Sequence, residues 1–392
     1  MPWQEQSRMS RRAEFVTWAH QEGANITELC RRYGISRKTG YKWLARAAAG
    51  ETAFPDRSHR PHRFPSRTAA AVEDAVRALR TEHPAWGGRK LHHTLQLQGM
   101  VQPPAPSTIT AILRRHDRLG AAVRPSRDYQ RFVADEPNDL WQIDFMGQPT
   151  MPTGKIHPLT VLDDHSRFAL LVAACAAAYA EIVAAHVLAR FDRYGLPRRI
   201  LTDNGPPWGT AGTPGLTALE ASWLRLGIVV SHGRPLHPQT QGKVERFHRT
   251  LAERLRWVGV PTTLVGFRRT LAWFREEYNE LRPHAALGLT PPAAHFTPSA
   301  RVYRPTPRPW IYPNGLDIRR VHHQGHVRVA GQAFFVSEAL AGEDVACLPL
   351  ADRILVIYRH MYVRELHPRR HQSVPLMQPV EAEWPMTASP HV

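Results

Sequence analysis

The chain has 392 residues, too many for one compact core, so about two to four domains are expected. Its 51 Lys and Arg residues outnumber its 34 Asp and Glu residues, and Arg carries most of the formal charge of +17. Because Arg binds phosphate through two parallel hydrogen bonds, this balance favours a polyanionic partner such as nucleic acid. The alternative is an enzyme that is basic without binding a polyanion.

The cysteines and the apolar runs exclude several classes of protein. Cys30, Cys175 and Cys347 are too few and too far apart for a disulfide framework or a Cys-x-x-Cys zinc site. The longest uncharged apolar run, FALLVAACAAAYA, is too short to span a bilayer, and the N-terminus has no signal-peptide core. We therefore expect a cytoplasmic protein.

Residues 10–48 predict a small helical domain. A helical segment ends near Gly34, which predicts a turn, and Ser36 predicts the N-cap of the next helix. Two short helices joined by a glycine turn are typical of a helix-turn-helix, whose second helix enters a DNA groove. A helical hairpin that binds nothing is the alternative. The residues expected to contact DNA are Arg37, Lys38, Thr39 and Lys42.

A basic linker rich in Pro, Arg and His leads to a second helical segment, residues 68–118. Three helices are predicted there, the middle one ended by Gly99 and the last one capped by Ser107. The pattern indicates a second helix-turn-helix with a weaker motif, and a purely structural three-helix domain is the alternative. Arg89 and Lys90, at the start of the middle helix, are the expected DNA contacts.

From Asp139 onward, short apolar runs alternate with amphipathic helices. The runs LWQIDFMG, HPLTVLDDHSRF, ALLVAACAA, RRILTDNG and IVVSHGRP are strand-like. Helices are predicted after the third, the fourth and the fifth of these runs. This order predicts a mixed five-stranded α/β sheet that is covered by helices.

Beyond Arg301 a proline-rich bridge leads to a third pattern. The runs HVRVAGQAFFVS, DVACLPL and RILVIYRHMYVREL alternate between apolar and polar residues, as strands of a small barrel do. We expect a compact all-β barrel of roughly seventy residues at this end of the chain.

Three carboxylates can meet at one edge of the predicted sheet. Asp144 lies in the first strand, Asp203 ends the fourth strand, and Glu245 lies in the first turns of a helix. Open α/β sheets place their sites at the carboxyl ends of strands, and the intervening segments are long enough for all three residues to converge. Oxygen ligands without Cys or His suit Mg²⁺ or Mn²⁺. Two such ions, about 4 Å apart, can stabilise an in-line phosphoryl displacement.

Other polar residues near these carboxylates carry weaker predictions. Asp163 and Asp164 are expected to be turn residues, with a catalytic role as the alternative. Asn204 either orients DNA or a metal-bound water, or only caps its turn. The helix of Glu245 also carries charges that are either phosphate contacts or ordinary solvated groups, namely Lys243, Arg246 and Arg249.

Several of these segments resemble the DDE transposases of bacterial insertion sequences, whose catalytic core is related to retroviral integrases. LWQIDFMG, DDHSRF, LTDNGPPW and HPQTQGKVERFHRTL match motifs of that core in the same order, and WGGRKL matches a motif of the second helical domain. The resemblance implies a ribonuclease-H-like core. In that core, Asp144, Asp203 and Glu245 would be catalytic and would hold two Mg²⁺ or Mn²⁺ ions.

The resemblance also implies a DNA partner and a reaction. Such a protein binds the terminal inverted repeats of an insertion sequence, cleaves a strand and joins its 3′-hydroxyl to target DNA. It is expected to self-associate as a dimer or higher oligomer on DNA, in the bacterial cytoplasm and on the nucleoid. A nuclease of the same fold without strand transfer and a domesticated DNA-binding regulator are the alternatives.

The chain departs from the family pattern in three places. Met146 stands where related proteins often carry Lys, and residues 208–216 lengthen the interval between Asp203 and Glu245. Helix-turn-helix segments replace the zinc-binding N-terminal domain of retroviral integrases. The expected boundaries are 1–50 and 67–120 for the two helix-turn-helix domains, 138–298 for the catalytic core, 314–380 for the barrel, and 51–66, 121–137, 299–313 and 381–392 for the linkers and the tail.

Overall fold

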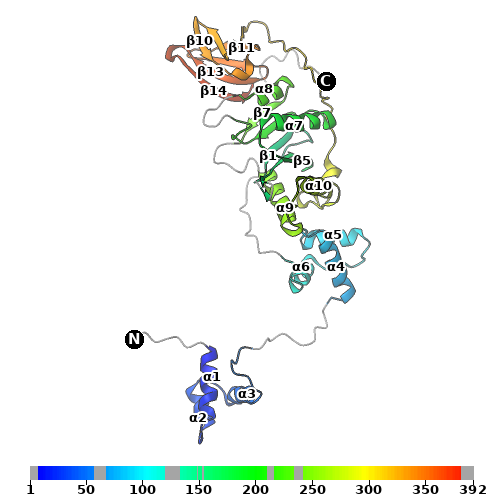
Figure 1. Ribbon diagram of the computed structural model, residues 1–392, viewed down its shortest axis with the longest axis vertical. Coiled ribbons are helices and arrows are strands. Elements are labelled where there is room, and N and C mark those ends of the chain that lie inside the picture. Colours follow the sequence, from blue (N-terminus) through cyan, green and yellow to red (C-terminus); the bar gives the residue numbers. More distant parts are fainter. Residues whose placement is uncertain are drawn as a thin grey trace. The chain divides into compact units, whose positions relative to one another are not determined.

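The protein is represented by a computed structural model, which describes residues 8–56, 68–119, 133–147, 149–151, 154–209, 216–233 and 242–380. The chain forms two compact units, Met1–Arg67 and Thr68–Val392 (Figure 1). Most of the expected linkers, the C-terminal tail and the loop that carries HPQTQ lie outside the described residues.

The first unit is a three-helix domain composed of α1 (Arg8–Ala19), α2 (Ile26–Arg32) and α3 (Arg37–Ala48). The turn before α3 contains Gly34 at φ +67°, and the Ser36 side chain accepts the backbone N–H of Thr39. A Cβ atom at Gly40 would lie 2.5 Å from the Sγ of Cys30, so only glycine lets α2 and α3 approach this closely. The predicted helix-turn-helix, including its cap, is confirmed.

The second unit begins with the helices α4 (Ala70–Glu82), α5 (Gly88–Leu97) and α6 (Pro106–Arg115), which enclose a small apolar core. A Cβ at Gly88 would lie 2.3 Å from the carbonyl oxygen of Pro106, so α5 and α6 also touch at a glycine. The prediction that Ser107 caps the third helix is wrong. The helix starts two residues earlier, because Pro106 has the fixed φ that suits a first helical position, and Ala105 precedes it without a side-chain cap.

A mixed five-stranded sheet forms the centre of the second unit, in the order β5-β4-β1-β6-β7. β4 pairs antiparallel with both β1 and β5, whereas β6 pairs parallel with both β1 and β7. The strands are β1 (Leu140–Phe145), β4 (His157–Asp163), β5 (Ala169–Cys175), β6 (Arg199–Thr202) and β7 (Val229–His232), with a small hairpin of β2 (Thr150–Met151) and β3 (Gly154–Lys155) between the first two.

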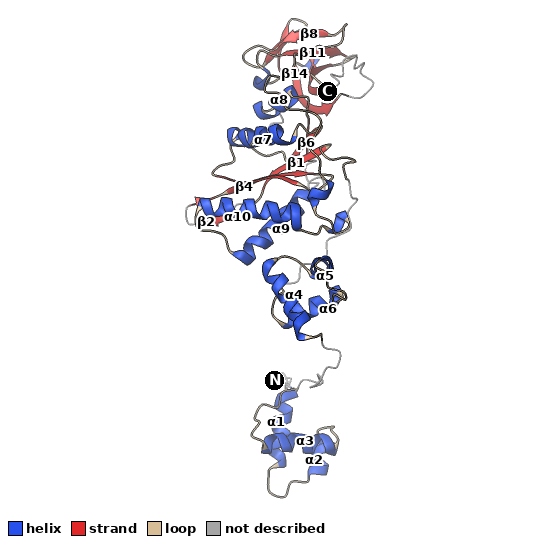
Figure 2. Ribbon diagram, turned by 90° about the vertical axis from the view of Figure 1, so that its right-hand side faces the viewer, coloured by secondary structure: helices blue, strands red, loops and turns tan. Residues whose placement is uncertain are grey.

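Helices cover both faces of this sheet: α7 (Ala180–Tyr194) and α8 (Ala218–Arg225) pack on one face, and α9 (Gly242–Val258) and α10 (Leu264–Glu276) on the other (Figure 2). Side chains alternate along β1. Trp141 and Ile143 enter the apolar core beneath α7, and Gln142 and Asp144 therefore face α9. The mixed sheet with helices on both faces confirms the ribonuclease-H-like core that the motifs implied.

The C-terminal part is built from antiparallel strands, as predicted. A five-stranded sheet has the order β14-β13-β12-β11-β8, and the hairpin of β9 and β10 contacts its two edge strands. The strands are β8 (Asp317–Arg320), β9 (His326–Val329), β10 (Gln332–Phe335), β11 (Asp344–Pro349), β12 (Ile354–Tyr358), β13 (Met361–His367) and β14 (Gln372–Pro379). Arg225 of α8 contacts Glu343 at 2.8 Å, which ties this part to the central core.

A buried ion pair links the α4–α6 helices to the central core. The π-helix η2 (Glu277–Leu281) continues α10, and its Glu277 lies 2.7 Å from the Nδ1 of His83 at the end of α4. Both side chains are almost fully buried, and the His83 ring stacks on Trp86 at 3.7 Å. None of the described helices combines the length and the apolar character needed to cross a bilayer.

Candidate active site

Asp144 lies in β1 at the centre of the sheet, opposite Thr160 of β4. The Thr160 hydroxyl donates to the backbone carbonyl of Asp144 at 3.0 Å, and it is 2.7 Å from the Nε2 of His248 on α9. The other ring nitrogen of His248 lies 3.8 Å from the Asp144 carboxylate. Burial lowers the pKa of His248 to about 4, so the ring beside Asp144 is neutral at physiological pH.

Asp203 follows the last residue of β6, at the carboxyl end of the strand parallel to β1. The backbone N–H of Gly205 donates to its carboxylate at 3.1 Å, which closes a tight turn. Asn204 donates from its side-chain amide to the carbonyl of Gly233 at 2.8 Å, so it ties this corner to the end of β7. The sharp corner therefore holds Asp203 at the edge of the sheet with its side chain exposed.

The two aspartates influence each other electrostatically. Burial, with the negative charge of Asp203 as the second cause, raises the pKa of Asp144 to about 7. Burial also raises the pKa of Asp203, although the Gly205 N–H and the charge of His232 oppose the shift. Two oxygen ligands that repel each other in a partly dry site are a suitable donor set for a hard cation.

The sequence did not reveal the histidine beneath Asp203. The Nδ1 of His232, the last residue of β7, is 3.0 Å from the backbone carbonyl of Asp203, and its Nε2 is 2.8 Å from the carboxylate of Glu220. Burial lowers the pKa of His232, but the hydrogen bond and the charge of Glu220 raise it more, and the net shift is upward. The acid that raises this pKa, Glu220 of α8, is fully buried, and no pattern in the sequence marks it as a partner of His232.

Glu245 lies in the first turn of α9, one residue after Val244. It is three residues before His248, and residues three apart share one face of a helix, so Glu245 lies on the side of α9 that meets Asp144. Its own carboxylate is exposed and contacts Arg249 at 3.4 Å. Among the described residues no three acidic, His or Cys side chains form a group that could hold a metal. The structure thus brings together Asp144 and Asp203, and leaves the Glu245 side chain apart from them.

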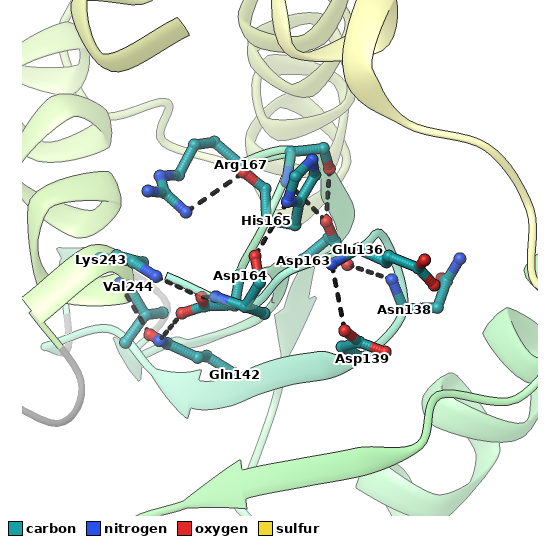
Figure 3. Close-up of polar contacts among 12 residues, drawn as sticks. Glu136, Asn138, Asp139, Gln142, Asp163, Asp164, His165, Arg167, Lys243 and Val244 are labelled. Carbon is teal, nitrogen blue, oxygen red and sulfur yellow. Dashed lines mark hydrogen bonds and ion pairs between the residues drawn. The ribbon is translucent and has the colours of Figure 1, made fainter. Parts of the chain in front are cut away.

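A buried polar network fixes the start of α9 (Figure 3). Gln142, two residues before Asp144, accepts the backbone N–H of Val244 at 3.2 Å and donates to Asp164 at 2.7 Å. Lys243 forms an ion pair with the same Asp164. This corrects the expectation of a free, phosphate-binding Lys243, because its ammonium already has a buried partner, and burial lowers its pKa to about 8.

The neighbouring Asp163 has a different set of partners. It accepts the backbone N–H groups of Asn138 at 2.7 Å and of Ser166 at 2.8 Å, together with the Ser166 hydroxyl. These contacts close the turn after β4 and hold the segment that enters β1 (Figure 3). The interpretation of Asp163 as a turn residue agrees with these contacts. Asp164, in contrast, contacts residues that are distant in the sequence, such as Lys243 of α9.

The residues expected to contact DNA lie in two groups. On α3, Arg37, Lys38 and Lys42 are exposed, whereas Thr39 is half-buried and its hydroxyl contacts Ser36 at 3.0 Å. The remaining expected residues on helices are Arg89, Lys90, Arg246 and Arg249, of which Lys90 is half-buried and the others are exposed.

Lys90 belongs to a cationic cluster that the sequence did not reveal. Burial first, and then the charges of Arg282 and Arg246, lower its pKa to about 6, although two acids on α9 and η2 oppose the shift. His284 lies among the same cations, and burial lowers its pKa to about 3. The Nδ1 of His284 is buried and has no hydrogen-bond partner within the described residues. The cluster joins α5, α9 and the segment after η2.

Comparison with known families assigns the central and N-terminal parts. Residues 134–238 match one family described as an integrase core domain, and residues 226–292 match a second family with the same description. Residues 11–62 match a helix-turn-helix domain, and residues 39–113 match a homeodomain-like domain. Helix-turn-helix segments therefore precede an integrase core in this chain.

The chain is also similar to proteins of two bacterial insertion elements. The chain is 28% identical over 242 residues to an uncharacterized 39.2 kDa protein of insertion element IS476 from Xanthomonas euvesicatoria, a match that covers 58% of this chain and 65% of that protein. It is 26% identical over 286 residues to an uncharacterized 31.7 kDa protein of insertion element IS407 from Burkholderia multivorans, covering 70% and 92%. The chain thus spans slightly less than two thirds of the first protein.

The solved structures that are similar include the simian T-cell lymphotropic virus intasome in complex with the PP2A regulatory subunit B56 gamma. One chain of that structure is 15% identical to this chain, with a TM-score of 0.37. The match covers 79% of this chain and 99% of that chain. The family matches and the insertion-element relatives carry the assignment. The chain carries helix-turn-helix domains followed by an integrase core domain. It is similar to proteins of bacterial insertion elements, as its motifs predicted.

Proposed function

We propose that this protein is a transposase that binds the terminal inverted repeats of an insertion sequence and catalyses strand cleavage and strand transfer. The observation that carries the proposal is the pair of Asp144 and Asp203 at the ends of adjacent parallel strands, where each carboxylate has a raised pKa. This pair lies within an integrase core domain and at the sheet edge where α/β folds place their sites.

The residues of the site fit a divalent metal ion. Asp144 and Asp203 offer only carboxylate oxygens. Burial, and then the negative charge of Asp203, raise the pKa of Asp144, and a bound cation would offset both effects. We infer that these two residues and Glu245 would hold two Mg²⁺ or Mn²⁺ ions. When bound, such ions supply charge stabilisation for the attacking and leaving oxygens of a phosphoryl transfer.

The chain's own residues would orient the site around these ions. Asn204 and His232 hold the Asp203 corner against β7, so the carboxylate keeps a fixed direction. His248 and Thr160 hold α9 against β1 beside Asp144. We infer that Glu245 turns away from Arg249 and toward the aspartates by a change of side-chain rotamer when the ions bind. No covalent protein–DNA intermediate is needed, since a 3′-hydroxyl is the nucleophile of the joining step.

Double-stranded DNA is the proposed partner, as both transposon end and target. The exposed Arg37, Lys38 and Lys42 of α3 would enter a groove, and the cationic cluster around Lys90 and Arg246 would bind backbone phosphates nearer the core. Joining two ends requires at least two protomers, so we propose self-association on DNA. Such a protein would act on the bacterial nucleoid.

The test is Mg²⁺-dependent joining of a labelled element-end duplex to a plasmid, with ends taken from the repeats that flank the gene. Wild type is compared with Glu245→Gln and with Glu181→Gln, a matched control because Glu181 is an exposed glutamate in the first turn of α7. We expect joined product from wild type and the control, and none from Glu245→Gln.

The other outcomes separate the alternatives. Cleavage of the end without joining, in wild type, would indicate a nuclease of the same fold. Specific binding of the ends with neither cleavage nor joining would indicate a DNA-binding regulator. Equal joining by Glu245→Gln would show that another residue is the third acid.

A further inference from the structure

Asp164 has more roles in the fold than a turn residue needs. It follows β4 directly, and its side chain is completely buried. One carboxylate oxygen accepts Gln142 at 2.7 Å, and the other accepts the backbone N–H of Ala134 at 2.7 Å and the ammonium of Lys243. Residues 134–142 and the start of α9, which are about a hundred residues apart in the sequence, therefore meet on one carboxylate.

These contacts exclude a direct role for Asp164 at the metal. Both of its oxygens already accept hydrogen bonds, and a buried carboxylate that loses such partners is strongly destabilised. Asp164 must therefore act through the residues that it contacts. Two of these groups, Gln142 and Lys243, lead to the start of α9.

The first N–H groups of a helix have no partner within the helix. In α9 the N–H of Val244 is accepted by Gln142, a side chain of the central strand β1. Asp164 orients the side-chain amide of Gln142 by accepting a hydrogen bond from its NH₂ group. The residue before Val244 is Lys243, which forms an ion pair with Asp164 (Figure 3). The residue after Val244 is Glu245.

We propose that Asp164 and Gln142 are positioning residues that fix the first turn of α9 to β1 and so place Glu245 beside Asp144. This inference rests on the proposed function, because it takes Glu245 as the third acid. Its physical basis is that Gln142 and Asp144 are two residues apart on one face of β1. The same strand therefore carries one catalytic acid and the anchor of the other.

The first experiment uses metal-free full-length protein and measures amide hydrogen exchange along α9. Gln142→Met keeps a side chain of similar length and removes the acceptor of the Val244 N–H, and Asp164→Asn removes the charge that holds Gln142 and Lys243. We expect exchange at Val244 and Glu245 to become at least tenfold faster in both variants, with the later turns of α9 unchanged.

Asp163→Asn is the matched control. Asp163 is as fully buried as its neighbour, but its partners lie in its own turn and at Asn138, and none of them is on α9. We expect this variant to lower the stability of the fold and to leave exchange in the first turn of α9 unchanged relative to the rest of the helix. If Asp163→Asn loosened α9 as much as Asp164→Asn, the proposal would be wrong.

A second readout is end joining in Mg²⁺. We expect Gln142→Met to lower kcat at least tenfold with little change in KM for the DNA end, because DNA binding does not depend on the tether. Gln142→Met with wild-type exchange and wild-type kcat would overturn the inference. If wild type joined no ends at all, the proposed transposase function would fail, and the exchange experiment would still decide whether the anchor holds α9.

Discussion

Asp144, the next-to-last residue of β1, and Asp203, the residue after β6, lie near the carboxyl ends of two adjacent parallel strands, and burial together with the charge of Asp203 raises the pKa of Asp144 to about 7. The folded protein therefore holds the two acids closer, and in a drier place, than the unfolded chain does. A site with this property is less stable when empty than when a cation is bound, because the cation offsets both the burial and the repulsion.

Asp144→Asn is expected to remove a pH dependence of stability. The pKa of Asp144 is higher in the folded chain, about 7, than the usual value of 3.8 in the unfolded chain. The stabilising proton is fully bound below the lower value and is lost as the pH rises through the higher one, so the metal-free protein loses stability between these pH values. The slope is at most about 1.4 kcal/mol per pH unit.

Urea unfolding of metal-free wild type and Asp144→Asn at pH 5 and pH 8 measures this effect. The variant should be the more stable protein at pH 8, and the difference should shrink at pH 5. Asp203→Asn should give a smaller change of the same sign, since Asp203 is the second cause of the shift. Parallel pH dependence in wild type and Asp144→Asn would show that Asp144 does not titrate as inferred.

Binding of DNA is expected to be accompanied by proton uptake at Lys90. Burial and the neighbouring arginines lower the pKa of this lysine to about 6, so it is mostly neutral in the free protein at pH 7.5. A nearby phosphate would raise that pKa and recharge the amine. Calorimetric titration with an element-end duplex, in buffers of different ionisation enthalpy at pH 7.5, should show uptake of up to about one proton per protomer. Lys90→Arg should bind the duplex without this uptake.

His83→Ala is expected to lower the free energy of unfolding by about 1–3 kcal/mol, because it removes the 2.7 Å hydrogen bond to the buried Glu277 and leaves only Arg254, at 4.0 Å, as its ion-pair partner. Glu277→Gln, which can still hydrogen-bond to the ring, should cost less. Chemical denaturation measures both variants. The control is His93→Ala on α5, a half-buried histidine for which the described part of the chain shows no hydrogen bond. Equal losses at His83 and His93 would contradict the role given to the buried pair.

Gly88→Ala is expected to destabilise the α4–α6 helices by about 1–3 kcal/mol, because the new methyl group would meet the backbone carbonyl of Pro106. The adjacent Gly87 provides a control, since a Cβ there meets nothing within 4 Å. Thermal unfolding of the two variants should show a lowered transition for Gly88→Ala and little change for Gly87→Ala. A similar transition in both variants would mean that α5 and α6 separate without cost.

Much of the fold could be read from local patterns. The turn at Gly34 and the cap at Ser36 depend on backbone conformation and on a bond between residues three apart, so the sequence was sufficient there. The cap of α6 was predicted two positions too late, because proline and serine next to each other both favour a helix start. The π-helix at Glu277 followed from no periodic signal, since it is stabilised by a partner on another domain.

The candidate site, like the fold, could be predicted from the sequence only in part. Alternation along β1 and the acid at the end of β6 were enough to predict that Asp144 and Asp203 meet, because strand periodicity and parallel order place them at one edge. Whether Lys243 faces DNA or the interior could not be predicted. That depends on Asp164, 79 positions earlier, and charge alone does not indicate which partner a lysine finds.

The sequence by itself therefore determined the class of the protein, the order of its helices and strands and the two aspartates of its site. Local conformation and side-chain periodicity are short-range properties, and they are encoded in neighbouring residues. Only the tertiary structure decided that Asp164 and Gln142 anchor α9, that His232 lies beneath Asp203 and that Lys90 is half-buried among arginines. These contacts join distant segments, and the energy of burying a charge depends on everything that surrounds it.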